Sequence, residues 1–258
     1  MLCCIAAPVS MDKSEILAIL NSAYFSAEPH EKETLDRLPL LLEGARVFVD
    51  VGASLGQYTQ AASRLLRGGR ILAVEADPLR HEELVRNCAR WADESGNRIS
   101  AVFAAASDAD GDTAFFVTHS NVSGGLFPHP ITHQAVTWDE IRVPARSLDS
   151  LCEGFEPDLV KIDVEGGELR VLQGCRRLLA ARKVVFLVEL HGWVDPQGRT
   201  IPRAVLDLMR GYGYARAPFH GQTLFVPTRA QWLRFWLRYL TLDWPADFRQ
   251  AHDTHPAS

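Results

Sequence analysis

The sequence predicts an α/β fold organised around a buried, mostly parallel sheet. From residue 45 onward, apolar strand-like segments alternate with helical segments, which is typical of connected strand–helix–strand units. The strand segments are apolar almost throughout, as expected when helices cover both faces of a parallel sheet. Several of them also end in an acidic residue, and open α/β sheets bind ligands at these carboxyl ends. We therefore expect right-handed crossovers and a ligand site along one edge of the sheet.

The composition is that of a globular protein. The chain has 258 residues, 47% hydrophobic and 23% charged, which is enough for one α/β domain with a sizeable core. Its net charge of −5 argues against binding nucleic acid through phosphates. The five cysteines form no C-x-x-C pair, so we expect reduced thiols and a cytoplasmic protein. No apolar run approaches the ~20 residues of a transmembrane helix.

Residues 1–44 are expected to form an N-terminal helical segment that covers an edge of the sheet or the ligand site. Its two helices are predicted over Asp12–Phe25 and over Glu31–Leu38, the second ending near Pro39. Residues 45–228 then form the ligand-binding domain. Its first half is expected to contain, in order, strand Arg46–Val51, helix Gln57–Leu66, strand Arg70–Glu75, helix Leu79–Trp91 and strand Ile99–Ala106.

Residues 107–150 interrupt this alternation and predict an inserted hairpin with a long loop. Its strands are expected at Thr113–Thr118 and Ile141–Val143, around a polar glycine loop at Asn121–Gly125. Alternation then resumes with strand Asp158–Val164, helix Gly166–Leu179, strand Lys183–Leu190, helix Pro202–Gly211, and an antiparallel pair at Tyr214–Ala217 and Gln222–Val226.

The last segment, residues 229–258, contains an amphipathic helix at Gln231–Leu242. Its aromatic and leucine residues recur at helical spacing, with arginines on the opposite face. We expect this helix to pack on the domain or on a second copy in a homo-oligomer; docking on a membrane surface is the alternative.

The first loop, within Val47–Tyr58, carries the most specific ligand signal. It contains Gly52 and Gly56 but lacks the third glycine of a dinucleotide fingerprint. Asp50 precedes it, and a carboxylate there repels pyrophosphate but suits a cation, whereas the following helix N-terminus suits an anion. S-adenosylmethionine (SAM) carries such a zwitterionic end. The alternative role for Asp50 is to cap the next helix.

Glu75 ends the second strand, where an acid that accepts hydrogen bonds from ribose hydroxyls is expected. Ribose is common to NAD and SAM, so Glu75 does not choose between them. A solvated strand end is the structural alternative.

The segment KIDVEGGE places four charged residues at the exit of an apolar strand: Lys161, Asp163, Glu165 and Glu168. Strand alternation puts Lys161 and Asp163 on one side, and Asp163 is expected to face the crevice. Glu165 and Glu168 fall at a helix start, where the dipole favours carboxylates.

Glu189 and His191 end the next strand in the same way. Histidine titrates near neutrality, which suits a general base. Asp163, Glu189 and His191 together could alternatively hold a divalent cation on the acceptor oxygen, an arrangement that we do not favour.

These motifs resemble the FkbM-type SAM-dependent methyltransferases. FVDVGASLGQYT resembles the family's first motif, VEADP its second, ARSLDSL its linker, and LVKIDVEGGELRVLQG its most distinctive segment. The resemblance runs from about Val47 to Leu190. Ser54 departs from it where the family commonly has Asn, and Ala76-Asp77 departs where Pro is frequent.

The resemblance implies a Rossmann-like class I methyltransferase fold: a mostly parallel seven-stranded sheet with an antiparallel last strand. It also implies SAM-dependent O-methylation of a hydroxyl on a small molecule, sugar or glycan. We assign the methionine end to Asp50, Gly52, Ala53 and Gly56, the ribose to Glu75 and Ala76, and the adenine to Ser107 and Asp108, with Asp163 beside the cofactor.

For the chemistry, His191 is the first candidate base and Asp163 the second, with Lys161 orienting Asp163 or steadying the acceptor oxygen. Asn121, Ser123 and Glu165 are candidates for positioning the substrate. Two rival functions remain open: an NAD-linked oxidoreductase, and a non-catalytic module that binds a partner. Nothing in the sequence names the acceptor.

Overall fold

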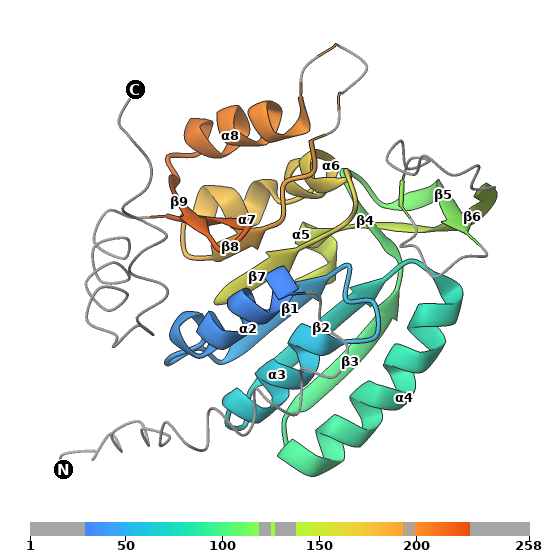
Figure 1. The fold of residues 1–258 in the computed structure, drawn as a ribbon, viewed down its shortest axis with the longest axis vertical. Helices are drawn as coiled ribbons and strands as arrows, with labels where there is room; N and C mark the ends of the chain where they lie inside the picture. Colours follow the sequence, from blue (N-terminus) through green and yellow to red (C-terminus); the bar gives the residue numbers. More distant parts are fainter. Residues whose placement is uncertain are drawn as a thin grey trace.

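The computed structural model describes residues 29–118, 125–126, 138–192, 194, 198 and 200–227. Its centre is a seven-stranded sheet in the order β3-β2-β1-β7-β8-β10-β9 (Figure 1). These strands are β1 (Val47–Val51), β2 (Arg70–Glu75), β3 (Arg98–Phe103), β7 (Leu159–Ile162), β8 (Val185–Val188), β9 (Ala215–Phe219) and β10 (Gln222–Val226). The first five are parallel, and β10 is antiparallel to both of its neighbours. The predicted class I fold with an antiparallel last strand is confirmed.

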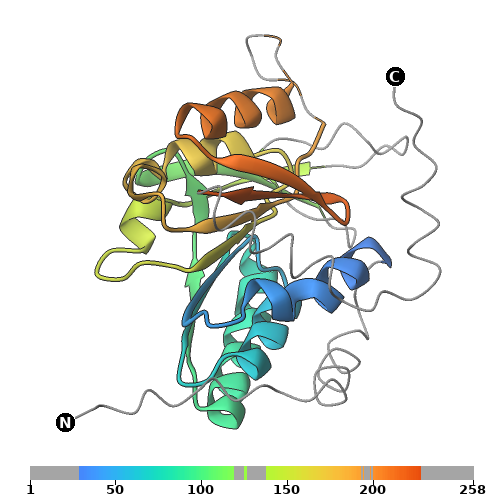
Figure 2. The ribbon, with the colours of Figure 1, turned by 90° about the vertical axis from the view of Figure 1, so that its left-hand side faces the viewer.

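Helices cover both faces of this sheet, which makes three layers (Figures 1 and 2). One face carries α2 (Pro29–Leu41), α3 (Gln57–Leu65) and α4 (Pro78–Ser95); the other carries α6 (Glu168–Gln173), α7 (Arg176–Ala181) and α8 (Ile201–Gly211). Alternate strand residues serve the two cores: Phe48 packs with α2 and α3, whereas Val49 packs with α6, α7 and α8. This alternation follows from the two-residue repeat of a strand.

The order of the strands defines a crevice. From β1 the chain builds outward through β2 to β3, and it then returns to place β7 on the other side of β1. A sheet of this kind binds ligands where the direction of building reverses, at the carboxyl ends of the strands. The loops that follow β1, β2, β7 and β8 therefore surround one site.

The predicted strand Ile99–Ala106 is wrong, because it is two strands in different sheets. β3 ends at Phe103, and β4 (Ala105–Ser107) joins a second sheet in the order β4-β6-β5. β5 (Gly111–Thr118) and β6 (Trp138–Ser147) form the inserted hairpin. The apolar run continues through the break at Ala104, so periodicity did not reveal it. β6 is much longer than the predicted Ile141–Val143. The prediction was too short because many of the other residues of β6 are polar and carry no apolar strand signal.

Some helix limits also differ from the prediction. α2 continues through Pro39 to Leu41. The predicted helix Gly166–Leu179 is two short helices, α6 and α7, separated at Gly174 and Cys175. Asp77 caps α4, since its carboxylate accepts hydrogen bonds from the backbone N–H groups of Leu79 and Arg80.

Three predictions lie outside the described residues: helix Asp12–Phe25, most of loop Asn121–Gly125 with its candidates Asn121 and Ser123, and helix Gln231–Leu242. Among the helices that are described, none combines the length and the apolar character that crossing a membrane requires.

Candidate active site

The first loop is packed tightly between β2 and the end of β7. Gly52 has φ +75°, and a Cβ there would lie 1.7 Å from the backbone carbonyl oxygen of Asp163. The backbone N–H groups of Gly52 and Ala53 both donate to the carbonyl of Val74, at 2.9 and 3.0 Å. Gly52 is thus required by a close approach of two chain segments, and this approach joins the first loop to the tip of β7.

Gly56 is required for a different reason from the one predicted. It has φ +95°, and a Cβ there would lie 2.7 Å from the Trp91 ring and 2.8 Å from Leu84. Both contacts belong to α4, so this glycine allows α3 to begin against α4. That Gly56 also contacts a ligand stays a prediction.

Asp50 is completely buried, which differs from the prediction that it offers its carboxylate to a ligand amine. The Thr59 hydroxyl donates to Asp50 Oδ2 at 2.8 Å. Burial raises the pKa of Asp50, opposed by the charge of Lys161 and by hydrogen bonds from Thr59. Thr59 lies in the first turn of α3, whose N-cap residue is Gly56, so this side-chain hydrogen bond joins the end of β1 to that helix. The alternative role of Asp50 as a helix cap stays a prediction. Its Oδ1 has no hydrogen-bond partner within the described residues.

Glu75 joins the first loop to the second. Its Oε2 accepts from the backbone N–H of Ser54 at 2.7 Å, and its Oε1 accepts from those of Ala76 and Asp77, each at 2.8 Å. Burial raises its pKa, and these three hydrogen bonds oppose the rise. Only 7% of the residue is exposed. Each carboxylate oxygen has two lone pairs, and three of the four are taken by these N–H groups, so Oε2 can still accept from one ribose hydroxyl.

Ser54 and Ala76, which donate to Glu75, lie in the two loops that it joins. Ser54 has φ +51°, a conformation that Asn tolerates better than Ser, and its hydroxyl accepts from Arg80 Nη1 at 2.6 Å. Ala76 is buried in the core of the second sheet, beside Phe115. Sequence reasoning missed Arg80; its position three residues after Asp77, in the first turn of α4, is the signal that could have found it.

Ser107 and Asp108, predicted to bind adenine, form hydrogen bonds within the protein. The Ser107 hydroxyl donates to Asp108 Oδ1 at 2.9 Å, and Arg170 of α6 donates to the same oxygen at 2.9 Å. Ser107 ends β4, in the second sheet, and its carbonyl lies against Gly174. Ser107 lies in this sheet because the chain leaves the central sheet at Ala104. The assignment of Ser107 and Asp108 to adenine stays a prediction.

Lys161 and Asp163 form a buried ion pair at the end of β7. Lys161 Nζ donates to Asp163 Oδ2 at 3.1 Å and lies 4.3 Å from the centre of the Tyr58 ring. Burial favours the neutral amine, but the charges of Asp163 and Asp50 outweigh it and raise the pKa of Lys161. Lys161 is therefore a cation between two carboxylates, with 2% of its surface exposed.

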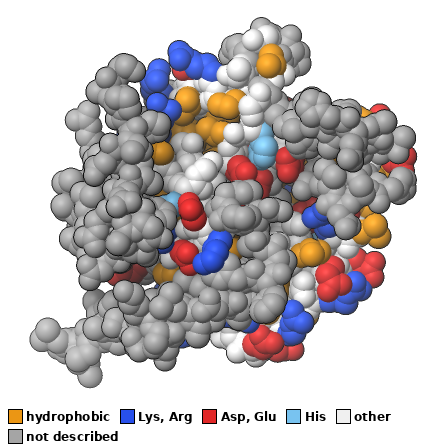
Figure 3. All heavy atoms as spheres, in the orientation of Figure 1, with side chains coloured by type: hydrophobic (Ala, Val, Ile, Leu, Met, Phe, Trp, Pro, Cys, Tyr) orange, Lys and Arg blue, Asp and Glu red, His pale blue; other side chains and the backbone are white. Residues whose placement is uncertain are grey.

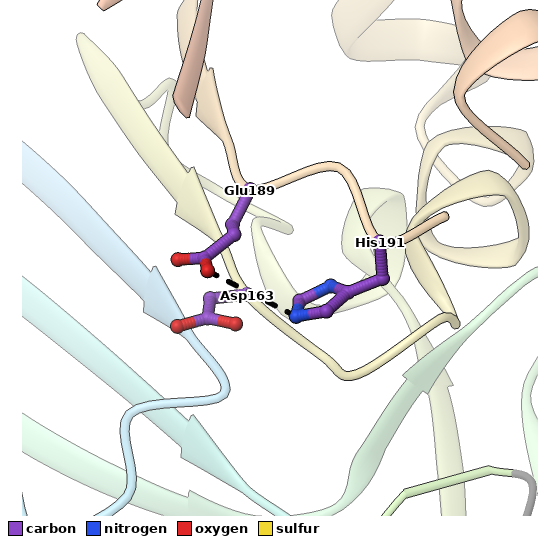
Figure 4. A group of neighbouring side chains, drawn as sticks. All are labelled: Asp163, Glu189 and His191. Atoms are coloured by element: carbon purple, nitrogen blue, oxygen red, sulfur yellow. Dashed lines mark ion pairs between the residues drawn. The ribbon is translucent and has the colours of Figure 1, made fainter. Parts of the chain in front are cut away.

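Four carboxylates surround His191, which follows β8. Nδ1 lies 2.6 Å from Glu168 Oε1, and Nε2 lies 3.3 Å from Glu165 Oε2 and 3.9 Å from Glu189 Oε1. Asp163 is the fourth, and Figure 4 shows it beside the ring and below the Glu189 carboxylate. Acidic and histidine side chains also gather near the middle of the face drawn in Figure 3.

This environment controls the proton on His191. Burial lowers the pKa of the ring, but the hydrogen bond to Glu168 and the charges of Glu168, Glu165 and Asp163 outweigh that effect and raise it to about 9. The ring is an imidazolium at neutral pH in this state. It becomes a strong base once the proton is lost, for instance when a cationic ligand binds nearby.

One ligand atom from each of Asp163, Glu189 and His191 lies within 4.8 Å of the others, close enough to share a cation. These are the three residues considered from the sequence. Lys161 already provides a positive charge to Asp163, however, and Gln222 donates to Glu189 at 3.3 Å. The geometry thus accommodates a metal ion without depending on one.

Sequence reasoning gave too little weight to Glu168, the closest partner of His191. The position of Glu168 at the start of a helix, where the dipole favours a carboxylate, was a sufficient reason for an acid there. Gln222 was missed altogether; it donates to both Tyr58 and Glu189 from the start of β10. A polar residue beginning an otherwise apolar strand was the only available signal.

Comparison with known proteins identifies the family. The model of the "Methyltransferase FkbM domain" matches residues 50–215. The chain is 30% identical over 171 residues to "Hexuronic acid methyltransferase AglP" of Haloferax volcanii, a match that covers 64% of this chain and 65% of that protein, so slightly less than two thirds of each.

Two solved structures are similar at low identity. Methyltransferase FkbM from Methylobacillus flagellatus matches at 16% identity with a TM-score of 0.49, over 82% of this chain and 58% of that one. An O-methyltransferase from Bacillus cereus in complex with SAH matches at 15% identity with a TM-score of 0.41, over 85% and 93%. The family model spans more than half of the sequence, so the chain belongs to the FkbM methyltransferase family.

Proposed function

We propose that this protein is a SAM-dependent O-methyltransferase that acts on a hydroxyl of a sugar, a glycan or a similar small molecule. The family supports methyl transfer. The relative from Haloferax volcanii is by its name a hexuronic acid methyltransferase, which supports a carbohydrate acceptor.

The observation that carries the proposal is the contact between the first loop and the tip of β7. Gly52 lies directly against the carbonyl of Asp163, and Asp163 lies beside His191. A ligand held by the first loop and Glu75 would therefore be adjacent to a group that can accept a proton. Methyl transfer needs this adjacency, because aligning donor and acceptor can contribute ~7–11 kcal/mol.

The residues of the crevice fit SAM. Glu75 can accept from ribose hydroxyls, Gly52 leaves no side chain over the first loop, and the carboxylates near His191 suit a ligand with positive charge. When bound, SAM supplies a methyl group that is already activated on a sulfonium. The protein then has to align the acceptor hydroxyl and remove its proton, which we assign to Nε2 of His191. A positioned base typically contributes ~10²–10⁴-fold.

SAM binding is the first test. Titration of the protein with SAM and with NAD by calorimetry should give binding of SAM alone. Glu75→Ala should weaken SAM binding, because it removes the ribose acceptor and the link between the two loops. Glu156→Ala, which removes an exposed carboxylate paired with Lys183, serves as the control and should bind like wild type. Binding of NAD without SAM would instead support the oxidoreductase.

The base assignment is tested by turnover. His191→Ala should lower kcat by at least about 100-fold while SAM affinity stays near wild type. In wild type, kcat/KM for the acceptor should rise with pH towards about 9, since the neutral ring is the base. Unchanged turnover in His191→Ala would remove His191 from the mechanism. A protein that binds SAM but methylates no sugar in a broad panel would support the non-catalytic alternative.

A bound cation is the alternative route for activating the hydroxyl. In that case activity would disappear in chelator and return with magnesium. Full activity in chelator, which we expect because Lys161 already balances Asp163, would exclude the cation.

A further inference from the structure

Glu168 is the most deeply buried of the acids around His191. No part of it is exposed, whereas the side chains of Glu165 and Glu189 are 23% and 22% exposed. It is the first residue of α6. Its Oε1 accepts from the Gly166 backbone N–H at 2.9 Å and lies 2.6 Å from His191 Nδ1. Its Oε2 has no hydrogen-bond partner in the part of the chain that is described.

Burying a carboxylate in this way is costly unless a charged or strongly donating group compensates it. Within the described residues, the ion-pair partner that the structure gives Glu168 is His191. The hydrogen bond from the Gly166 N–H is what a carboxylate at the start of a helix would make, but it supplies no positive charge. The carboxylate therefore requires a proton on Nδ1 of His191, and this leaves Nε2 as the nitrogen that can exchange one.

The two nitrogens face different surroundings. Nδ1 meets the buried Glu168 of α6, and Nε2 meets Glu165 of the loop before α6 and Glu189 of the loop after β8. Asp163, paired with Lys161, adds its charge from the tip of β7. Nε2 thus lies on the side of the crevice, near Asp163, whose carbonyl meets Gly52 of the first loop.

We propose that Glu168 is a positioning residue: by holding Nδ1–H of His191 inside the protein, it fixes the ring so that Nε2 faces the acceptor. This inference rests on the proposed function, because it assigns Glu168 a task in that same reaction. It predicts that Glu168 acts on catalysis through His191 and through no other group.

A double-mutant cycle tests this dependence. Glu168→Gln keeps the size of the side chain and an oxygen that can accept from Gly166, but it removes the charge. We expect kcat to fall about 10- to 100-fold, a part of what a positioned base contributes, while KM for SAM stays within about twofold. In a His191→Ala background the same change should have no further effect on kcat. An equal loss in both backgrounds would show a merely structural role and overturn the proposal.

Two more variants keep the test interpretable. Glu168→Asp retains the charge and should recover part of the activity lost in Glu168→Gln, which a packing role would not predict. Glu156→Gln removes an exposed carboxylate that is paired with Lys183 and should leave kcat unchanged. Thermal unfolding of every variant shows whether the protein is folded. Should Glu168→Gln not fold, Glu168→Asp carries the same cycle, with a smaller loss expected in wild type and none in His191→Ala.

An NMR measurement needs no acceptor and so separates this inference from the proposed function. With ¹⁵N-labelled histidine, the Nδ1–H proton of His191 should give a strongly low-field signal, because its hydrogen bond to a carboxylate is short. The signal should be absent in His191→Ala and should move upfield in Glu168→Gln. A wild type without it would overturn the inference even if methylation is observed. If the signal behaves as expected but no acceptor is methylated, the fault lies with the proposed function.

Discussion

Gly52 is the residue at which the first loop meets the end of β7. Its φ of +75° and the carbonyl of Asp163 both exclude a side chain. Gly44 has the same φ of +75°, but a Cβ there would meet nothing within 4 Å, so it isolates the cost of the backbone conformation.

We expect Gly52→Ala to destabilise the protein by at least about 3 kcal/mol, because the methyl group would overlap backbone atoms that cannot move independently. Gly44→Ala should cost only about 1 kcal/mol. Urea denaturation of both variants measures the difference. Similar losses in the two would mean that the loop can move away from Asp163, and that the contact does not fix the site.

Lys161 shows how a buried residue can matter without touching a ligand. Its ammonium balances Asp50 on β1 and Asp163 at the tip of β7, and it lies over the Tyr58 ring of α3. Removing one partner of such a buried pair leaves an uncompensated charge, which costs more than the pair contributes. The proposed role of Lys161, orienting Asp163, depends on this ion pair.

Among the elements, β4 connects the second sheet to α6. By leaving the central sheet at Ala104 it carries Ser107 to the junction of α6 and α7, where the Ser107 carbonyl would lie 2.1 Å from a Cβ on Gly174. Arg170 of α6 and Asp108 reinforce the same junction. The inserted hairpin is therefore fixed to α6, the helix that carries Glu168.

Gly174→Ala should weaken this junction. Gly174 has φ −83°, a conformation open to any residue, so its cost is purely the clash with Ser107, about 2 kcal/mol or more. Gly211→Ala in α8 meets nothing within 4 Å and should be neutral or slightly stabilising. Thermal unfolding compares the two, and equal melting temperatures would show that β4 does not depend on this contact.

For the molecule as a whole, the charge on His191 should link stability to pH. Its pKa is about 9 in the folded protein and about 6.5 in an unfolded chain. The folded state therefore holds this proton more tightly, so the stabilisation is complete below pH 6.5 and is lost as pH rises to about 9.

We expect the free energy of unfolding to fall over this range by up to about 3 kcal/mol. Urea denaturation at pH 6, 7.5 and 9 measures it, and in His191→Gln the contribution of this group should disappear. A wild-type stability that stays constant, or the same slope in the variant, would contradict the assigned charge state.

The sequence by itself determined the architecture and the residues at the edge of the sheet. Apolar runs that end in Asp50, Glu75, Asp163 and Glu189 specify strands, and parallel strands bring their carboxyl ends to one edge. Capping by Asp77 was equally readable, because the cap and its partners lie within one turn of helix. Such features depend on neighbours along the chain.

Tertiary structure alone decided which of these residues meet and which are exposed. Asp50 is enclosed because α3 packs over the end of β1, and Ser107 is diverted because β4 pairs with β6, a strand far along the chain. The bond between Glu168 and His191 exists because β7 and β8 are neighbours in the sheet. Burial and side-chain pairing across strands depend on long-range packing, which no local pattern encodes.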